Sequence, residues 1–383
     1  MVSKLPRPVW LLGWVSLATD AATEAVYPLL PFFLTTVLGA GAVSLGVIEG
    51  AAEATNSLIK IFAGRVADRA PSKRPLVLFG YTVSSLARPF IAITTTWTQV
   101  FAVRVLDRVG KGVRGAPRDA ILASWATPTT RGKVFGFHQG MDHIGAVVGP
   151  TLATLFLLAY PGQYRSLFAL TIIPGAIAVA LIFFIREEQA ERVEVRAKPD
   201  ARAVNAGTGS LNGFMVVAAL FTLGNSTDAF LLLRLTAVAG TVRFVPLMWA
   251  ALHVVKASVS MIGGSWSDRV GRRTVIALGW AIYAVVYGGF ALSTTLPALF
   301  GWFLLYGFYY GFAEGTGKAL VADLAPVARR GFAFGVYDGV LGFGALAASV
   351  IFGLVWNAYG TAAAFGLGSA LALIASALLF LVV

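Results

Sequence analysis

The sequence predicts an all-α membrane protein with twelve transmembrane helices in two six-helix bundles. Two observations carry this prediction: a composition suited to lipid, and a loop motif that occurs once in each half of the chain. Of the 383 residues, 57% are hydrophobic and 13% are charged, whereas a soluble domain carries roughly 25% charged residues. The mean hydropathy is +0.78. Such a chain is expected to cross the membrane many times.

Each predicted helix is a run of about 20 mostly apolar residues, the length needed to cross the hydrocarbon core. The twelve runs are 9–37, 44–66, 74–95, 98–123, 133–159, 166–186, 212–236, 244–266, 274–294, 297–322, 332–357 and 361–382. The first run is too long for the apolar core of a signal peptide, and it contains Asp20 and Glu24. We therefore expect it to be retained as a helix.

The loops between these runs alternate in charge, because most basic loop residues lie on one side of the predicted membrane. By the positive-inside rule, that side and both termini are cytoplasmic, and the protein is expected in the cell membrane. The net charge of +12 therefore reflects topology rather than nucleic-acid binding. The one long polar segment, 187–211, is predicted to be a cytoplasmic linker between bundles 1–186 and 212–383.

The halves share two motifs about 200 residues apart. Gly64–Arg69 reads GRVADR and returns as GSWSDR at Gly264–Arg269, while RGKVFG at Arg131–Gly136 returns as RGFAFG at Arg330–Gly335. A repeat of six helices that starts from the same side of the membrane implies two halves related by an axis along the membrane normal.

The chain resembles the major facilitator superfamily along its whole length. The segments Gly64–Arg74 and Gly264–Arg273 are similar to that family's motif A, although the first copy has Ala70-Pro71 where a Gly is usual. The resemblance implies that this motif gates the cytoplasmic side, and the alternative is a basic loop that only sets topology. The implied gating residues are Gly64, Asp68, Arg69, Asp268, Arg269 and Asp338.

The fourth run carries a stripe of charge, although it is long enough to span the membrane. Its basic residues recur at helical spacing on one face: Arg104, Arg108, Lys111, Arg114 and Arg118. Charge in hydrocarbon is costly, so such a face is expected to line a bundle interior or a wet cavity. The segment Arg108–Gly112 resembles the family's motif B, with Lys111 in place of a neutral polar residue. This favours a substrate with an anionic or zwitterionic group; the alternative is a set of buried ion pairs that hold helices together.

The fifth run contains Gly145, Gly149 and Pro150 in a segment similar to motif C, with Ala153 where a later Gly is expected. This resemblance implies a proton-coupled antiporter. Small residues four apart also permit close helix packing, and Pro150 can bend the helix, so ordinary packing is the alternative.

Three carboxylates are candidates for proton coupling. Asp20 and Glu24 lie one turn apart near the middle of the first run, and Asp142 lies in the fifth. Two carboxylates that close cannot both stay ionised cheaply in the membrane, so one of them can carry a proton.

The candidate substrate-binding residues come from both halves. They are Glu53, Arg104, Asp107, Arg108, Lys111, Arg114, Asp228, Tyr310 and Glu314. Glu314 and Lys318 are an i,i+4 pair that can equally neutralise each other.

The sequence as a whole predicts a secondary active transporter that exports a small organic compound by proton-coupled alternating access. Proton-coupled uptake of an organic anion is the alternative, and a channel or a transport-inactive sensor is less favoured. No Ser/His/Asp set or metal motif points to an enzyme, the chain has no Cys and three His, and no cofactor other than the proton is expected. We expect a monomer in the lipid bilayer, with a small-molecule substrate and no nucleic acid.

Overall fold

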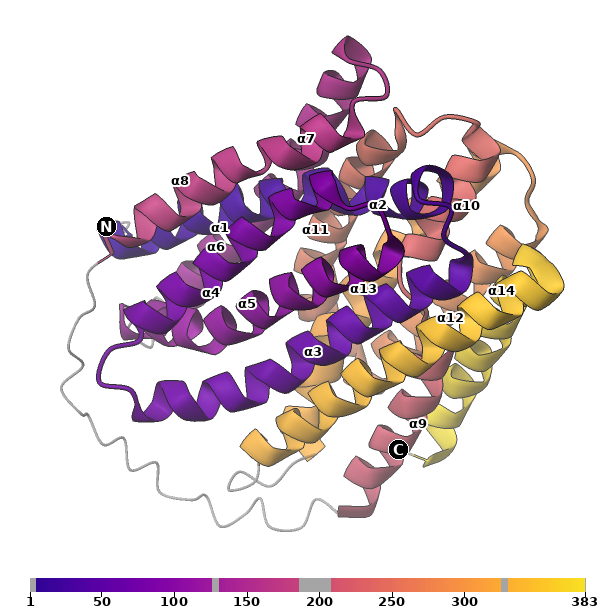
Figure 1. Cartoon of the computed structure of the whole chain (residues 1–383). Coiled ribbons are helices and arrows are strands. Elements are labelled where there is room, and N and C mark those ends of the chain that lie inside the picture. Colours follow the sequence, from indigo (N-terminus) through magenta and orange to yellow (C-terminus); the bar gives the residue numbers. More distant parts are fainter. Residues whose placement is uncertain (1–4, 126–130, 186–207, 325–329, 383) are drawn as a thin grey trace. The chain divides into compact units, whose positions relative to one another are not determined.

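The computed structural model describes residues 5–125, 131–185, 208–324 and 330–382. All regular elements in these ranges are helical, as Figure 1 shows. Most of the predicted linker, 187–207, lies outside the described residues, and so do the side chains of Asp68, Asp268 and Arg269. The boundaries proposed for the two bundles stay a prediction.

The first half contains six predicted spans, some of them built from several short helices. Their bounds are α1 Arg7–Val26, η1 Tyr27–Leu29, α2 Leu30–Phe32, η2 Phe33–Val37, α3 Ala42–Arg69, α4 Arg74–Ala87, η3 Arg88–Ile93, α5 Trp97–Ser124, α6 Arg131–Ala159, α7 Tyr164–Leu170 and α8 Ile172–Ile182. Pro28 and Pro31 explain the short turns after α1, because proline lacks the N–H that a continuous α-helix needs.

The second half contains the other six predicted spans. Its helices are α9 Thr208–Gly224, α10 Ala229–Ala239, α11 Val245–Val270, α12 Arg272–Leu292, α13 Leu296–Leu324 and α14 Arg330–Val382. Gly360 divides α14 into the last two predicted spans, because its φ of 85° is outside the helical region. The run 212–236, predicted as one helix, is broken between Gly224 and Ala229.

Seven of the described helices are long and apolar enough to cross a membrane. One of them, Gly335–Val382, is the pair that Gly360 separates, and Val245–Val259 is a shorter apolar helix. The remaining predicted spans correspond to α1 with its following turns, α3 and α5, which carry charged residues in their interiors. These helices are less hydropathic than the other spans because they contain charged residues. The same charged residues make them candidates for a functional site.

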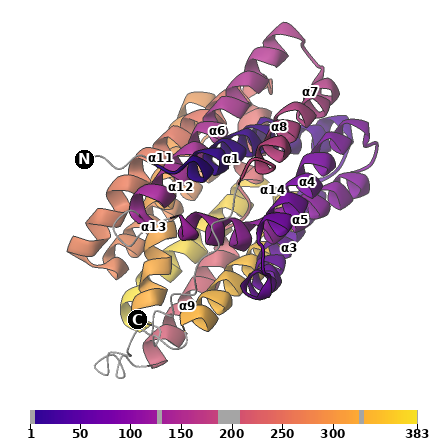
Figure 2. The same cartoon turned by 90° about the vertical axis from the view of Figure 1, so that its left-hand side faces the viewer.

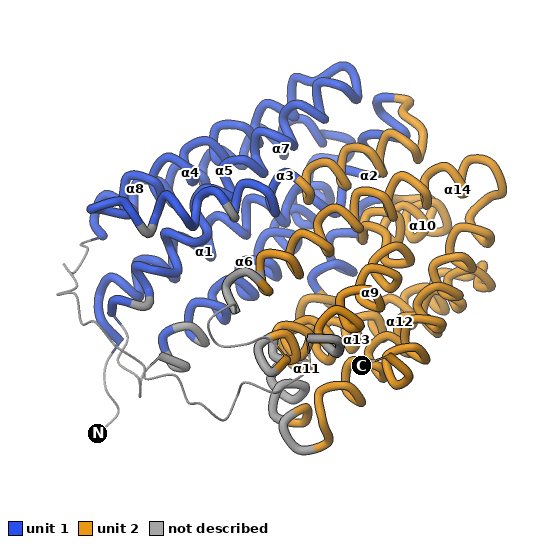
Figure 3. The backbone as a smooth tube through the Cα atoms, turned by 90° about the horizontal axis from the view of Figure 1, so that it is seen from below, with its two compact units in different colours: residues 1–38, 55–194, 242–250 blue, residues 39–54, 195–241, 251–383 orange. Residues whose placement is uncertain are grey.

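The described chain forms two compact units, coloured separately in Figure 3. Unit 1 holds residues 1–38, 55–194 and 242–250, and unit 2 holds residues 39–54, 195–241 and 251–383. In unit 1, α1 packs against α6 and α8, and α4 packs against α5 and α8 (Figure 2). In unit 2, α14 packs against α9 and α12, and α12 packs against α13. These contacts bring the charged face of α5 and the carboxylates of α1 and α6 into the same unit.

Candidate functional site

A buried cluster of charge in unit 1 is built around Asp107 on α5. Its carboxylate lies 3.1 Å from Nε of Arg88, 3.6 Å from Nη1 of Arg108 and 3.9 Å from Nη1 of Arg104. The side chains of Asp107 and Arg88 are only 3% and 4% exposed. One carboxylate therefore lies within 4 Å of three guanidinium groups in a buried place, where charges are screened little.

Several donors of this cluster point at no protein acceptor. Among the described residues, Arg88 Nη2, Arg108 Nε and Arg114 Nη1 are buried and make no hydrogen bond. The Arg114 guanidinium instead lies 4.3 Å from the centre of the Tyr81 ring. Buried donors are normally paired, so this arrangement is suited to receive acceptor atoms from an anionic group or from water.

Next to this cluster, unit 1 contains a polar cavity of about 170 Å³. Two carboxylates face it, from Asp20 on α1 and Asp142 on α6, together with four cationic side chains. Its lining is Ser16, Thr19, Asp20, Lys60, Tyr81, Lys111, Arg114, Gly115, Arg118 and Asp142. Acids and bases from four different helices thus share one small space, where binding of an anion and of a proton can influence each other.

Asp142 is held by two side chains of the same unit. The Ser16 hydroxyl donates a hydrogen bond to one of its oxygens, and Nδ1 of His138 lies 3.6 Å from the other. Asp20 is placed beside it by the close packing of α1 on α6. The pair that the structure brings together in this cavity is therefore Asp20 with Asp142.

The two glycines of the motif-C segment make that close packing possible. A Cβ built on Gly145 would lie 2.5 Å from the carbonyl oxygen of Leu17, and one on Gly149 would overlap the backbone of Ala21. Both contacts are with α1, within one turn of Asp20. Gly145 and Gly149 thus set the distance between the helices that carry Asp20 and Asp142.

Gly149→Ala is expected to destabilise the protein by about 1–3 kcal/mol, because an overpacked interface must move a backbone rather than a flexible side chain. Gly140→Ala is the matched control in α6, since nothing lies within 4 Å of a Cβ at Gly140. The measurement is the midpoint of thermal unfolding in detergent. Equal midpoints for the two variants would contradict the proposed packing.

Glu24 has a different environment from Asp20. Its Oε2 accepts a 2.7 Å hydrogen bond from the indole N–H of Trp249, in the part of α11 that belongs to unit 1. The Trp249 ring lies 5.1 Å from that of Tyr27, and the Arg104 guanidinium lies over the Tyr27 ring, 5.8 Å from its centre. Glu24 thus belongs to an aromatic contact rather than to the polar cavity.

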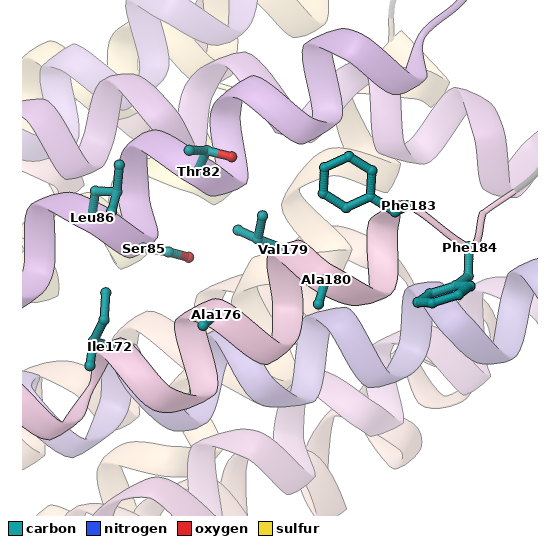
Figure 4. A pocket seen from close by; sticks show the side chains of 9 residues that line it. All are labelled: Thr82, Ser85, Leu86, Ile172, Ala176, Val179, Ala180, Phe183 and Phe184. Carbon is teal, nitrogen blue, oxygen red and sulfur yellow. The ribbon is translucent and has the colours of Figure 1, made fainter.

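A second hollow of unit 1 has the opposite chemistry. Figure 4 shows it between α4 and α8, with Leu86, Val179 and Phe183 among its lining side chains and the hydroxyls of Thr82 and Ser85 as its polar side-chain groups. Its volume is about 490 Å³. An apolar lining suits hydrocarbon rather than a charged compound, so this hollow is not our candidate site.

Comparisons with known proteins decide the family. The family model described as Major Facilitator Superfamily matches residues 12–255 and 215–383. An uncharacterized MFS-type transporter of Methanocaldococcus jannaschii is 30% identical, with 99% of this chain and 96% of the relative covered. The chain belongs to the major facilitator superfamily.

Other similarities agree with this assignment. The multidrug resistance protein MdtH of Photorhabdus laumondii is 25% identical over 80% of this chain and 76% of its own length. Among solved structures, the nucleoside transporter NupG has a TM-score of 0.83 at 14% identity, covering 98% of this chain and all of that one. The human organic anion transporter TETRAN has a TM-score of 0.68 at 17% identity, with coverage of 98% and 100%. This chain is thus a multi-pass membrane transporter with the MFS fold, as predicted, and belongs to a family of transporters rather than enzymes.

In this MFS transporter the other predicted site residues are more dispersed. Asp228 and Tyr310 meet in unit 2, whereas Glu53 and Glu314 are exposed. Of the predicted gating residues, Arg69 is exposed at the end of α3, Asp338 is half-buried near the start of α14, and Gly64 has room for a side chain. Their roles stay predictions.

Two charged residues of this transporter were not among the site residues predicted from the sequence. Arg88 interrupts an apolar span 14 positions after Arg74, and a buried Arg at that depth is itself a signal of a partner. Lys256 was visible as a charge within a span, but its pairing with Asp228 joins residues 28 positions apart on different helices. Spacing along one helix reveals a stripe, and it does not reveal such pairs.

Proposed function

We propose that this transporter exports a small organic compound with an anionic or zwitterionic group across the cell membrane in exchange for protons, by alternating access and with both termini in the cytoplasm. The observation that carries the proposal is the cluster of buried arginine side chains beside the polar cavity of unit 1.

The preference for an anionic group rests on charge. Arg88, Arg104 and Arg108 gather within 4 Å of Asp107, and the adjoining cavity adds Lys111 and Arg114. Buried donors without acceptors are costly, and within the part of the chain that the structure describes Arg88, Arg108 and Arg114 each have one, so a carboxylate or phosphate that enters the cavity recovers part of that cost. Guanidinium groups are also suited to bidentate contacts with such anions.

The proposal of proton coupling rests on cations that the cavity carboxylates and a substrate anion would share. Asp20 and Asp142 line the same cavity as Lys111, Arg114 and Arg118, so each carboxylate is stabilised in its charged form by cations that a substrate anion would also use. When the substrate takes those cations, a carboxylate loses its partner and is more easily protonated. Binding of substrate and uptake of a proton would thereby be linked, which couples the two fluxes; the choice of exchange over symport rests on other grounds.

The direction of exchange rests on resemblance. The motif-C glycines favour antiport, and a relative that is 25% identical is called a multidrug resistance protein. The likeness to a human organic anion transporter concerns the fold and is compatible with an anionic substrate. Proton-coupled uptake uses the same residues and is the second candidate; a channel or a sensor would not need a shared acid–base cavity.

Gating by the motif-A loops is part of the proposal. The predicted set places Asp68 and Arg69 at the end of α3 and the second copy at the end of α11. An Asp at a helix end among cations can pair with them or with a neighbouring helix N-terminus. Breaking such contacts is how we expect the cytoplasmic side to open.

Two measurements test the proposal. A thermal-shift screen compares organic acids and zwitterions with their neutral esters or amides, because a ligand that prefers the folded state raises the unfolding temperature. For a ligand found in this way, proteoliposomes are loaded at acidic pH and placed in neutral buffer. Antiport predicts that the ligand accumulates inside; symport predicts accumulation only when the outside is acidic; a channel or sensor predicts none in either case. Stabilisation by neutral analogues alone would overturn the choice of an anion.

Lys111→Gln is expected to weaken binding of the anionic ligand about tenfold or more, because a charge-assisted contact contributes about 1.5–3 kcal/mol. The affinity is measured by isothermal titration in detergent. Lys318→Gln is the control, since it removes the same charge from an exposed position on α13. Equal affinities of the two variants would show that Lys111 does not contact the substrate.

A further inference from the structure

The helix that crosses unit 2 near Asp228 is broken in its interior. The span Leu211–Ala239 is long and apolar enough to cross a membrane, yet α9 ends at Gly224 and α10 begins at Ala229. Backbone groups freed inside hydrocarbon must find partners in the protein or line a polar cavity. Broken helices of this kind mark binding sites in transporters.

Neighbouring side chains satisfy part of the broken segment. The Tyr283 hydroxyl donates to the carbonyl oxygen of Gly224 at 2.9 Å, and the backbone N–H of Thr227 donates to Ser349 at 3.3 Å. The Asn225 amide donates to the Tyr309 hydroxyl at 3.0 Å. Side chains of unit 2 therefore provide hydrogen-bond partners for the broken segment. The break also places Asp228 at the start of α10, where the helix dipole favours a negative charge.

The Asp228 carboxylate is surrounded by tyrosines of α13 and one cation of α11. Tyr306 donates to its Oδ1 at 2.7 Å, and Tyr310 lies 3.0 Å from each oxygen. Nζ of Lys256 lies 3.4 Å from Oδ2. The side chains of Asp228 and Lys256 are each 11% exposed, so this centre is close to fully covered and still reachable.

The Lys256 ammonium also lies over an aromatic face, 3.6 Å from the centre of the Tyr310 ring. The Tyr306 ring lies edge-on to that of Tyr310 at 5.3 Å, and Tyr309 lies at 5.0 Å. A carboxylate and a tyrosine face converging on one ammonium is the arrangement with which proteins recognise organic cations. Here the occupant is a side chain of the protein itself.

We propose that Asp228, Tyr306 and Tyr310 form a recognition site for the ammonium group of an organic amine, and that Lys256 occupies this site in the conformation described. An incoming amine would displace Lys256 from Asp228 and take the position over the Tyr310 ring. This site belongs to unit 2 and is chemically separate from the cationic cavity of unit 1. It stands independently of the proposed export of anions.

The test removes the internal occupant. Binding of benzylamine, which is protonated at pH 7, is measured by isothermal titration with the full-length protein in detergent, and benzyl alcohol serves as the neutral probe of the same shape. Lys256→Met is expected to raise the affinity for benzylamine about tenfold or more, because the site no longer has to be vacated first. Lys318→Met, which removes an exposed charge from the same unit, is expected to leave the affinity unchanged.

Two further variants identify the site. In the Lys256→Met background, Asp228→Asn should abolish benzylamine binding, and Tyr310→Leu should weaken it more than Tyr310→Phe, which keeps the ring face. If Asp228→Asn does not fold, the comparison between the two Tyr310 variants decides. The proposal is overturned if Lys256→Met binds benzylamine no better than the unaltered protein, or if benzyl alcohol binds equally well.

These outcomes are separable from those for the proposed function. Amine binding that depends on Asp228, without any response to organic acids, would leave this site standing and remove the anion proposal. Acid-dependent transport without amine binding would do the reverse.

Discussion

Asp20→Asn is expected to abolish accumulation of substrate driven by a pH gradient, while exchange of substrate at equal pH continues. Asp20 faces the cavity that also contains Lys111 and Arg114, and an amide cannot take up or release the proton that links the two fluxes. A gradient of one pH unit supplies about 1.4 kcal/mol, enough for about tenfold accumulation by one-for-one exchange. Proteoliposomes loaded at acidic pH are therefore expected to show about tenfold accumulation with the unaltered protein and none with the variant.

Two other carboxylates provide the comparison. Glu24→Gln is expected to keep gradient-driven accumulation, because Glu24 is engaged by Trp249 outside the cavity lining. Asp142→Asn is expected to resemble Asp20→Asn, since Asp142 lines the cavity with Asp20. If Asp20→Asn and Asp142→Asn both accumulate substrate with unaltered pH dependence, the coupling site lies elsewhere. If Glu24→Gln alone loses accumulation, Glu24 is the coupling group.

The fold could be predicted from the sequence because the lipid bilayer imposes simple rules on the helices that cross it. Each helix needs an apolar run of a fixed length, and the motif at Gly64–Arg69 and its repeat at Gly264–Arg269 divide the chain into corresponding halves. The family assignment follows from the same loops and agrees with the match to residues 12–255 and 215–383. The break after Gly224 was not predicted. The segment Asn225–Asp228 contains neither Gly nor Pro, so its polar residues are equally typical of one polar turn within a continuous helix.

The site was predictable only in part. The stripe from Arg104 to Arg118 is visible because helical periodicity fixes which residues share a face. The partners of that stripe come from other helices, as Arg88 does for Asp107. Their pairing depends on how helices cross, which no periodicity encodes. The same limit applies to the carboxylates: the sequence pairs Asp20 with Glu24 by spacing, whereas the cavity joins Asp20 to Asp142.

Asp107→Asn is expected to cause the largest loss of stability, about 3–5 kcal/mol, because it removes the carboxylate that balances three buried guanidinium groups. The measurement is the unfolding midpoint in detergent together with the fraction of protein that elutes as a single species. Asp119→Asn is the matched control on the same helix. Asp119 pairs with Arg118 at 2.9 Å, but its side chain is 50% exposed, so its loss should cost less than about 1 kcal/mol.

A second substitution distinguishes two causes of the lost stability: an uncompensated buried charge and a change in packing. Arg88→Met alone removes one of the cations around Asp107 and should also destabilise, since the nearby carboxylate loses its 3.1 Å contact. In the Asp107→Asn background the same change should instead recover stability, because one uncompensated buried charge disappears, and the coupling between the two sites should reach about 0.5–3 kcal/mol. Additive losses would show that Asp107 acts through packing. Recovery would show that Asp107 acts by offsetting the buried positive charge of its arginine neighbours, a charge that an anionic substrate could also use.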